Sequence, residues 1–320
     1  MSPLRLSHAL LVACLCSQGC QTSQASQAPS QSEPSVFDDG TAAREVGRAT
    51  VLAAEPSDCS LEITVPGLQW QPTTLLRIPI VVHIIADDGC TTGAVSDQMV
   101  ADQIASLNED YRATPGTLGE AGVDSQLELV LATTDPNGQP TTGITRDCNA
   151  TWYRDKGSYW TSLAWDPQRY VNVYVNSAGG SRGYVPFLPA DPAGAIGTSA
   201  DRVVINQLAF GRPGPFPPYD QGRTVTHELA HYLGLFHTYF EGCGIATAPD
   251  CYTTGDRLCD TTPNATSHKG CPAVTACGGA TAPVTNYMEL TDDACMTGFT
   301  AEQVQRMRCT LATYRPLLAR

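Results

Sequence analysis

Three of the six histidines in this chain lie within eleven residues, in the segment HELAHYLGLFH from 227 to 237. On a helix, His227 and His231 project from one face, one turn apart, so both imidazoles can reach one metal ion. Gly234 can end this helix in a conformation that residues with a Cβ atom resist, which turns the chain and brings in His237 as a third nitrogen ligand. Three neutral imidazoles suit Zn²⁺ and leave a fourth position open for water. The segment therefore predicts a catalytic zinc site.

Glu228 directly follows the first of these histidines. It is too short to share the metal from its own face of the helix, so we expect it to hold the attacking water and take its proton as a general base. The reaction implied is hydrolysis of a peptide bond. The competing interpretation, in which the histidines cap the helix or lie in the core, is weakened by Gly234 and His237.

Met288, in the downstream segment TNYMEL, is expected to form a hydrophobic floor beneath the histidines. A single methionine is most often an ordinary core residue. The joint pattern is more specific, because H-E-x-x-H-x-x-G-x-x-H followed by such a Met-turn is the metzincin signature.

The elements that must position these residues follow from hydrophobic periodicity. Apolar, β-branched runs predict strands at 76–85, 125–134, 170–176 and 201–207. A packed helix is predicted over 95–112, and a final helix over 300–314, where Thr300 and Gln303 can form a capping box. The Pro- and Gly-rich stretch 210–222 is a loop that leads into the histidine helix. The first half is thus an α/β arrangement, and the region beyond Phe240 is loops and cysteines.

Composition describes an acidic globular protein of 320 residues, with 42% hydrophobic residues and a net charge of -13. An acidic surface argues against nucleic acid and against anionic membranes as partners. We expect protein or peptide substrates and a monomer.

The amino terminus is typical of an exported protein. Residues 1–20 form a signal peptide, in which Cys14 ends a lipoprotein-like box and Cys20 is a second candidate for lipid attachment; a plain secretory signal is the alternative. Residues 21–35 are a Gln/Ser/Pro tether, 36–70 a pro-segment and 71–320 the catalytic domain. No other stretch is long and apolar enough to span a membrane. The protein is therefore expected to be secreted or displayed at the cell surface.

Thirteen cysteines, ten of them beyond position 50, predict a disulfide framework in an oxidising compartment. A zinc-thiolate cluster is the alternative, but the later cysteines contain no Cys-x-x-Cys pair. Proximity and parity suggest the pairs Cys90–Cys148 and Cys251–Cys259.

Beyond the histidine helix, the sequence resembles the pappalysin family of metzincins, and its bacterial ulilysin-like members most closely. The resemblance runs from about Arg77 to the C-terminus and rests on the segments IPIVVHII, QIASLNEDYR, DPNGQPTTGITR, HTYFEGC, GDRLCDTTP, NYMEL and TDDACMTGFTAEQVQRM. It implies an α+β metzincin fold: an α/β-like upper subdomain with a twisted, mostly parallel sheet, the zinc helix, and a loop-rich lower subdomain with a C-terminal helix. It also implies a zinc peptidase made as a zymogen.

The resemblance also assigns roles to particular residues. Asp293 matches the residue that lines the S1' pocket, where its carboxylate would favour Arg or Lys after the scissile bond. Asp256 and Asp260 match candidate Ca²⁺ ligands, with Asx turns as the alternative role. Disulfides would join Cys243 to Cys277 and Cys271 to Cys295.

Two positions depart from the family pattern. Relatives read NYMDY at the Met-turn, where the second tyrosine can stabilise the oxyanion; here Leu290 stands in its place. Tyr287 is expected to be a packing residue and not to replace this tyrosine. The oxyanion must then rely on zinc and another donor, so we expect lower turnover. In the pro-segment, relatives carry RCGT, whose cysteine caps the zinc, whereas this chain reads DDGT. Asp39 could therefore cap the metal through its carboxylate, with Cys59 as a competing thiol.

The leading interpretation is a zinc endopeptidase. The missing tyrosine at Leu290 motivates an alternative, a surface binding or adhesion module that keeps the scaffold but contributes little catalysis; Glu228 argues against it. A zinc hydrolase that acts on other amides is a third reading, which the remaining motifs do not favour.

Overall fold

The computed structural model describes residues 37–38, 58–191 and 195–319. The predicted signal peptide, the tether, Cys14, Cys20 and Asp39 lie outside the described residues. Across the parts that it describes, no helix combines the length and the apolar character needed to cross a bilayer.

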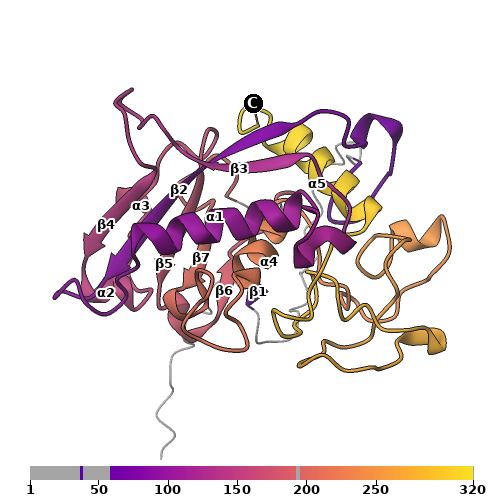
Figure 1. The fold of residues 1–320 in the computed structure, drawn as a ribbon. Coiled ribbons are helices and arrows are strands. Elements are labelled where there is room, and N and C mark those ends of the chain that lie inside the picture. The colour runs from indigo at the N-terminus through magenta and orange to yellow at the C-terminus, as the bar shows by residue number, and fades with distance from the viewer. Residues whose placement is uncertain (1–36, 39–57, 192–194, 320) are drawn as a thin grey trace, which may run out of the picture. The chain divides into compact units, whose positions relative to one another are not determined.

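The strands, which lie between Phe37 and Asn206, form one seven-stranded, mostly parallel sheet (Figure 1). Its order is β1-β6-β7-β5-β2-β3, and β4 also pairs with β2. The pairs of β2 with β3, β4 and β5, and of β5 with β7, are parallel, whereas β6 runs antiparallel to both β7 and β1. The strands are β1 (Phe37–Asp38), β2 (Leu76–Ala86), β3 (Leu127–Leu131), β4 (Ile144–Cys148), β5 (Val171–Asn176), β6 (Gly183–Val185) and β7 (Val203–Asn206). All four predicted strands form, and the sequence analysis missed β1, β4 and β6.

Three longer helices accompany the sheet, α1 (Asp97–Tyr111), α4 (Arg223–Tyr232) and α5 (Ala301–Tyr314). Shorter helical segments are α2 (Ala150–Tyr153), α3 (Trp160–Leu163), η1 (Leu68–Trp70), η2 (Leu118–Ala121), η3 (Ala178–Gly180), η4 (Gln207–Ala209), η5 (Asp250–Tyr252) and η6 (Cys277–Gly279). Ser96 caps α1, and the predicted capping box of Thr300 and Gln303 opens α5. The helices predicted at 95–112, at the histidine segment and at 300–314 are therefore confirmed.

Alternate residues of the strands face two separate packing layers. On one face, Ile80 and Val82 of β2 join a core cluster with residues of α1 and α4, which cross the front of the sheet in Figure 1. On the other face, Ile85 of β2 packs with Tyr174 and Tyr159 beside α2 and α3. Because both faces are covered, the central strands β2 and β5 are largely apolar, as is typical of a parallel sheet.

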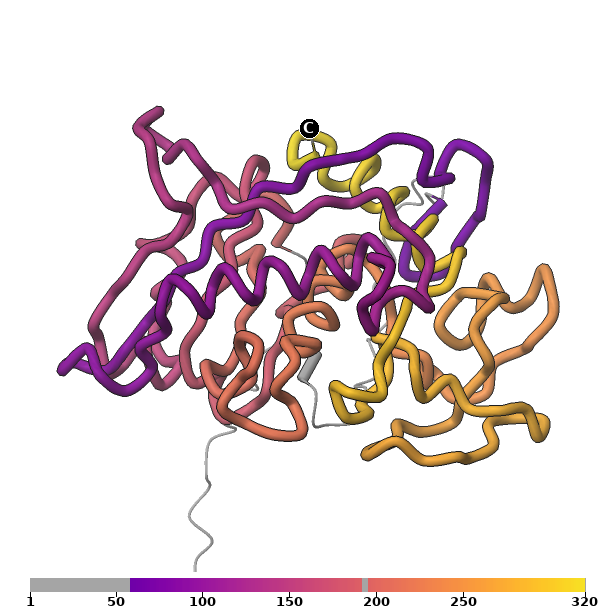
Figure 2. Tube along the Cα trace, viewed as in Figure 1, coloured from indigo at the N-terminus to yellow at the C-terminus, as the bar shows by residue number. Residues whose placement is uncertain are grey.

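The segment between α4 and α5 has almost no regular structure, and Figure 2 shows it as a series of orange and yellow loops. Three disulfides cross-link it: Cys243–Cys277, Cys251–Cys259 and Cys271–Cys295. Two further disulfides, Cys90–Cys148 and Cys59–Cys309, join parts of the chain outside this segment. All four pairings named from the sequence are present, and the fifth removes Cys59 as a candidate thiol for the zinc.

Residues 58–70, assigned from the sequence to the pro-segment, pack against the rest of the domain. Cys59 is buried and bonded to Cys309 of α5. The amide of Thr64 donates to the carbonyl of Tyr252 at 3.0 Å. The expected boundary at residue 71 therefore does not coincide with a break in packing, because a disulfide spanning 250 residues ties the earlier segment down.

Candidate active site

The zinc helix predicted from the sequence is α4, and each of its ten residues is buried. It begins after Gly222, whose φ of 78° lies in the left-handed region that glycine adopts most readily. The carboxylate of Asp293 accepts the backbone N–H groups of Gln221 at 2.8 Å and Arg223 at 3.1 Å. A negative charge at this end complements the helix dipole, so Asp293 fixes where α4 starts.

The turn after α4 depends on Gly234, whose φ is 93°. A Cβ atom at this position would lie 2.4 Å from the hydroxyl oxygen of Thr310 in α5. Only glycine therefore allows the chain to turn this close to α5, which brings His237 back towards the helix.

The side chains of His227, His231 and His237 converge. Their Nε2 atoms lie 3.0 to 3.1 Å from one another. His227 Nδ1 donates to the carbonyl of Tyr287 at 2.6 Å, and His231 Nδ1 to that of Leu235 at 2.8 Å. Because a carbonyl can only accept, the proton of neutral His227 and of neutral His231 lies on Nδ1, and the Nε2 lone pair of each ring faces the cluster.

These three rings fit a zinc ion. Burial lowers the pKa of His227 to about 4 and also lowers the pKa values of His231 and His237, so the imidazoles are neutral, as ligands must be. Tetrahedral zinc with Zn–N distances of about 2.0–2.1 Å holds its nitrogen ligands about 3.3 Å apart, close to the spacing seen here. Within the described ranges this is the one group of three or more His, Cys, Asp or Glu side chains whose ligand atoms lie close enough for one metal ion.

Glu228 follows the first of these histidines in α4, is buried, and packs against β6. A Cβ atom on Gly183, the first residue of β6, would lie 2.7 Å from Glu228 Cγ. The absence of a side chain at Gly183 therefore leaves room for this carboxylate between α4 and β6.

Met288 lies in the Met-turn and is fully buried in the core cluster that includes α4. Its amide donates to Asn286 Oδ1 at 2.9 Å, and its carbonyl accepts the amide of Thr238 at 3.3 Å. The Met-turn therefore contacts the segment directly after the third histidine.

A buried network behind α4 supports the first histidine. Asp110 of α1 lies 3.0 Å from the guanidinium of Arg223 and accepts the hydroxyls of Thr226 at 2.6 Å and Tyr287 at 2.9 Å. Tyr287 is thus a packing residue, as expected, while its carbonyl orients His227. Burial raises the pKa of Asp110 to about 6 against the opposing effect of Arg223. Sequence analysis missed Asp110, since nothing local links α1 to the Met-turn.

A small cavity beside the histidine cluster is lined by Asp293 and His227. The role of Asp293 in substrate selection stays a prediction. Burial raises the pKa of Asp293 to about 6, opposed by the two backbone N–H groups and by Arg223 and Arg182. Two residues that the sequence analysis missed, Arg182 and Tyr219, stack with the guanidinium 3.9 Å from the ring centroid. The cavity is lined by Arg182, Tyr219, Arg223, Thr224, His227, Glu289, Leu290, Asp293 and Met296.

Asp256 and Asp260, the candidate calcium ligands, have separate partners. Asp256 accepts the hydroxyl of Thr261 at 2.9 Å. Asp260 accepts the hydroxyl of Thr300 and the amide of Glu302, both at 2.8 Å, and so caps the start of α5. Calcium at these residues stays a prediction.

The fold and the site together define a class of protein. A mostly parallel sheet with an antiparallel edge strand, a histidine helix, a glycine turn to a third histidine and a buried Met-turn are the features of a metzincin zinc metallopeptidase.

Comparison with known proteins agrees. A family model described as Peptidase_M43, pregnancy-associated plasma protein-A, matches residues 154–312. The extracellular metalloprotease 1 of Coccidioides posadasii is 33% identical over 251 residues, which cover 75% of this chain and 80% of that protein. An extracellular metalloprotease of Pyricularia oryzae is 31% identical over 277 residues, covering 83% and 84%. The chain therefore belongs to the pappalysin family of metallopeptidases.

Solved structures of this kind are also similar. Mirolysin in complex with compound 9 has a TM-score of 0.65 and 32% identity, covering 77% of this chain and 97% of that one. A Tannerella forsythia promirolysin mutant has a TM-score of 0.62 at 32% identity, covering 78% and 86%. Mature mirolysin of the same organism in complex with a cleaved peptide has a TM-score of 0.59 at 31% identity, covering 77% and 99%.

Proposed function

We propose that this metallopeptidase is an exported endopeptidase, made as a zymogen, that cuts preferentially before Arg or Lys and uses Glu228 as its general base. The observation that carries the proposal is the convergence of three Nε2 atoms within 3.1 Å of one another, next to a buried carboxylate. One relative was solved in complex with a cleaved peptide, which supports peptides as the substrate class.

His227, His231 and His237 would hold Zn²⁺, which when bound acidifies water and polarises a carbonyl group. Glu228 accepts the proton of the attacking water and delivers it to the leaving amine nitrogen. Asp110 and Tyr287 keep His227 in one tautomer and orientation, because the ring donates its Nδ1 proton to the carbonyl of Tyr287.

The preference for a basic residue after the cut rests on Asp293, a buried carboxylate in a cavity that also contains His227. Such a site attracts Arg or Lys because charge pairing is strong where water is scarce. Arg182 lines the same cavity and opposes a basic side chain. The preference therefore depends on the negative charge of Asp293 outweighing this repulsion.

The test of specificity uses the full chain after it has matured. The matured protein digests a peptide mixture, and the residue after each cut is identified. Asp293→Asn is the matched variant, since the amide oxygen can still accept the N–H groups that start α4. We expect cuts before Arg and Lys to dominate in the parent and to fall at least tenfold, relative to other cuts, in the variant. An unchanged distribution would show that Asp293 does not select the substrate.

Latency is assigned to Asp39, in place of the family's cysteine. Strand β1 lies at the edge of the sheet, ends one residue before Asp39 and pairs antiparallel with β6, which packs against Glu228. A pro-segment on this edge would occupy the approach to the site, and the carboxylate would cap the zinc. We expect the Asp39→Ala protein to process itself faster than the parent, as measured by gel electrophoresis over time. Equal or slower processing would refute the assignment.

Export is supported by the names of the relatives, extracellular metalloproteases, and by the five disulfides. Lipid attachment at Cys14 or Cys20 is tested by the mass of the exported protein, which carries the acyl chains only if a cysteine is modified.

A further inference from the structure

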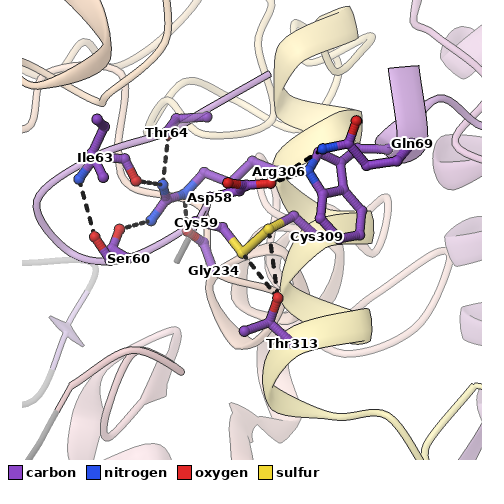
Figure 3. Close-up of a disulfide and its surroundings, with 11 residues drawn as sticks. Asp58, Cys59, Ser60, Ile63, Thr64, Gln69, Gly234, Arg306, Cys309 and Thr313 are labelled. Carbon is purple, nitrogen blue, oxygen red and sulfur yellow. Dashed lines mark hydrogen bonds between the residues drawn. A yellow bond between two sulfur atoms is a disulfide. The ribbon is translucent and has the colours of Figure 1, made fainter. Parts of the chain in front are cut away.

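The segment from Asp58 to Val65, here called the N-terminal strap, is bound to α5 by more than its disulfide (Figure 3). Its two ends are joined, because the amide of Val65 donates to the carbonyl of Asp58 at 2.7 Å. The carboxylate of Asp58 also accepts the indole N–H of Trp70 at 2.9 Å. The strap is thus a closed loop, held on α5 through Cys59 and Cys309.

Arg306 of α5 connects this strap to the zinc site. One guanidinium nitrogen donates to the carbonyl of Ser60 at 2.7 Å, and another donates to the hydroxyl of Thr64 at 2.6 Å and the carbonyl of Ile63 at 3.3 Å. The Nε–H donates to the carbonyl of Gly234 at 2.7 Å. The side chain is only 2% exposed, and these four acceptors are neutral oxygens.

Gly234 belongs to the turn that carries the chain from His231 to His237. Arg306 touches this turn at a second place, where its guanidinium lies 4.8 Å from the ring centroid of Phe236. Thr310, one turn further along α5, fills the space beside Gly234. The position of the third histidine therefore depends on a turn that α5 holds from outside the site.

We propose that Arg306 is a positioning residue for the zinc site: clamped by the disulfide-anchored strap, it fixes the turn at Gly234 and so holds His237 against His227 and His231. The inference rests on the proposed zinc function of these histidines. It also makes the strap a permanent part of the active enzyme, so that maturation removes only residues before Asp58.

The test compares Arg306→Met, Arg306→Lys and Arg308→Met. Arg308 is a matched control on the same helix, because it also donates to two backbone carbonyls, those of Ser125 and Thr74, but is not bonded to the turn. The measured quantity is the dissociation constant for zinc, from competition with a chromogenic chelator, with the melting temperature of the zinc-free protein recorded in parallel.

We expect Arg306→Met to raise the zinc dissociation constant at least tenfold and Arg306→Lys to restore part of the affinity, because an ammonium group can still donate to Gly234. Arg308→Met should stay within twofold of the parent. If both Met variants lose zinc equally, or neither does, Arg306 has no positioning role. A parent that binds no zinc would instead refute the proposed function itself, so the two failures are distinguishable.

A second pair of variants keeps the guanidinium and loosens the strap, in case Arg306→Met does not fold. Cys59→Ser with Cys309→Ser removes the anchor, and Cys90→Ser with Cys148→Ser removes a disulfide elsewhere in the chain. We expect a loss of zinc affinity of threefold or more in the first pair only. Equal affinities in both pairs, or an active enzyme whose mass shows that it begins after Val65, would overturn the inference.

Discussion

The sheet with its helices and the loop-rich segment between α4 and α5 are stabilised in different ways. Apolar strands such as β2 and β5 are buried on both faces and paired along their length. The loop-rich segment is instead held by three disulfides and by buried carboxylates. Glu289, for example, accepts hydrogen bonds from the hydroxyl of Thr238 and the side-chain amide of Asn264, both at 2.7 Å. The zinc site joins both regions, since His227 and His231 lie on a buried helix and His237 lies where the loops begin.

The largest effect is expected when one disulfide of the loop-rich segment is removed. Cys271→Ser with Cys295→Ser opens a loop spanning 24 residues, and the loss of such a cross-link costs about 3 kcal/mol. Asp293 lies two residues before Cys295, so we expect the specificity pocket to lose its shape while the sheet persists. Far-UV circular dichroism should change little, whereas kcat/KM for peptides with a basic residue after the cut should fall more than tenfold. A uniform loss of secondary structure would show that the two regions do not differ as described.

The stability of the sheet can be tested through a titratable group that is buried in it. His83 of β2 lies 2.8 Å from Thr145 Oγ1 and 3.0 Å from Asn172 Oδ1, and burial lowers its pKa to about 4. Between pH 6.5 and 4 the unfolded chain binds a proton that the folded chain does not, so stability is full above pH 6.5 and falls as the pH falls towards 4. Urea unfolding of zinc-free protein should show this slope, reduced in His83→Gln by up to about 1.4 kcal/mol per pH unit. An identical slope in both proteins would mean that folding does not lower the pKa of His83.

The smallest expected effect concerns the departure at the Met-turn. Leu290 is 6% exposed and lines the cavity beside His227, at the position where the family resemblance leads us to expect a tyrosine. We expect Leu290→Tyr to raise kcat a few-fold at similar KM, because a phenol can donate a hydrogen bond to the oxyanion. The melting temperature serves as the control for altered packing. An unchanged kcat would count against a role for this position.

Elements encoded by neighbouring residues could be predicted from the sequence, whereas elements that depend on distant parts of the chain could not. The four predicted strands and α1 follow from local periodicity, α4 follows from the spacing of the histidines, and the capping box at Thr300 needs only four consecutive residues. Strand β4 reads ITRDC and is mostly polar, and β6 has only three residues, so neither has an apolar pattern that identifies a strand; each forms by pairing with a neighbour, β4 with β2 and β6 with β7.

Contacts made over long sequence separations escaped the sequence analysis for a physical reason. Cys59 was expected in a pro-segment because its partner, Cys309, is 250 residues away and spacing does not determine pairing. Asp110 and Arg306 look like ordinary helix-surface charges in the sequence, yet each is buried and bonded to a segment that holds a zinc ligand. Only the folded arrangement distinguishes them from other charged residues.

The central claim is that three histidines hold zinc while Glu228 performs the proton transfer. The most direct test loads the matured parent and Glu228→Ala with zinc, measures the bound metal per chain, and follows cleavage of a peptide mixture. We predict one zinc per chain in both proteins and peptide cuts only in the parent. Cuts that persist in Glu228→Ala, or a fully zinc-loaded parent that cuts no peptide, would contradict the claim.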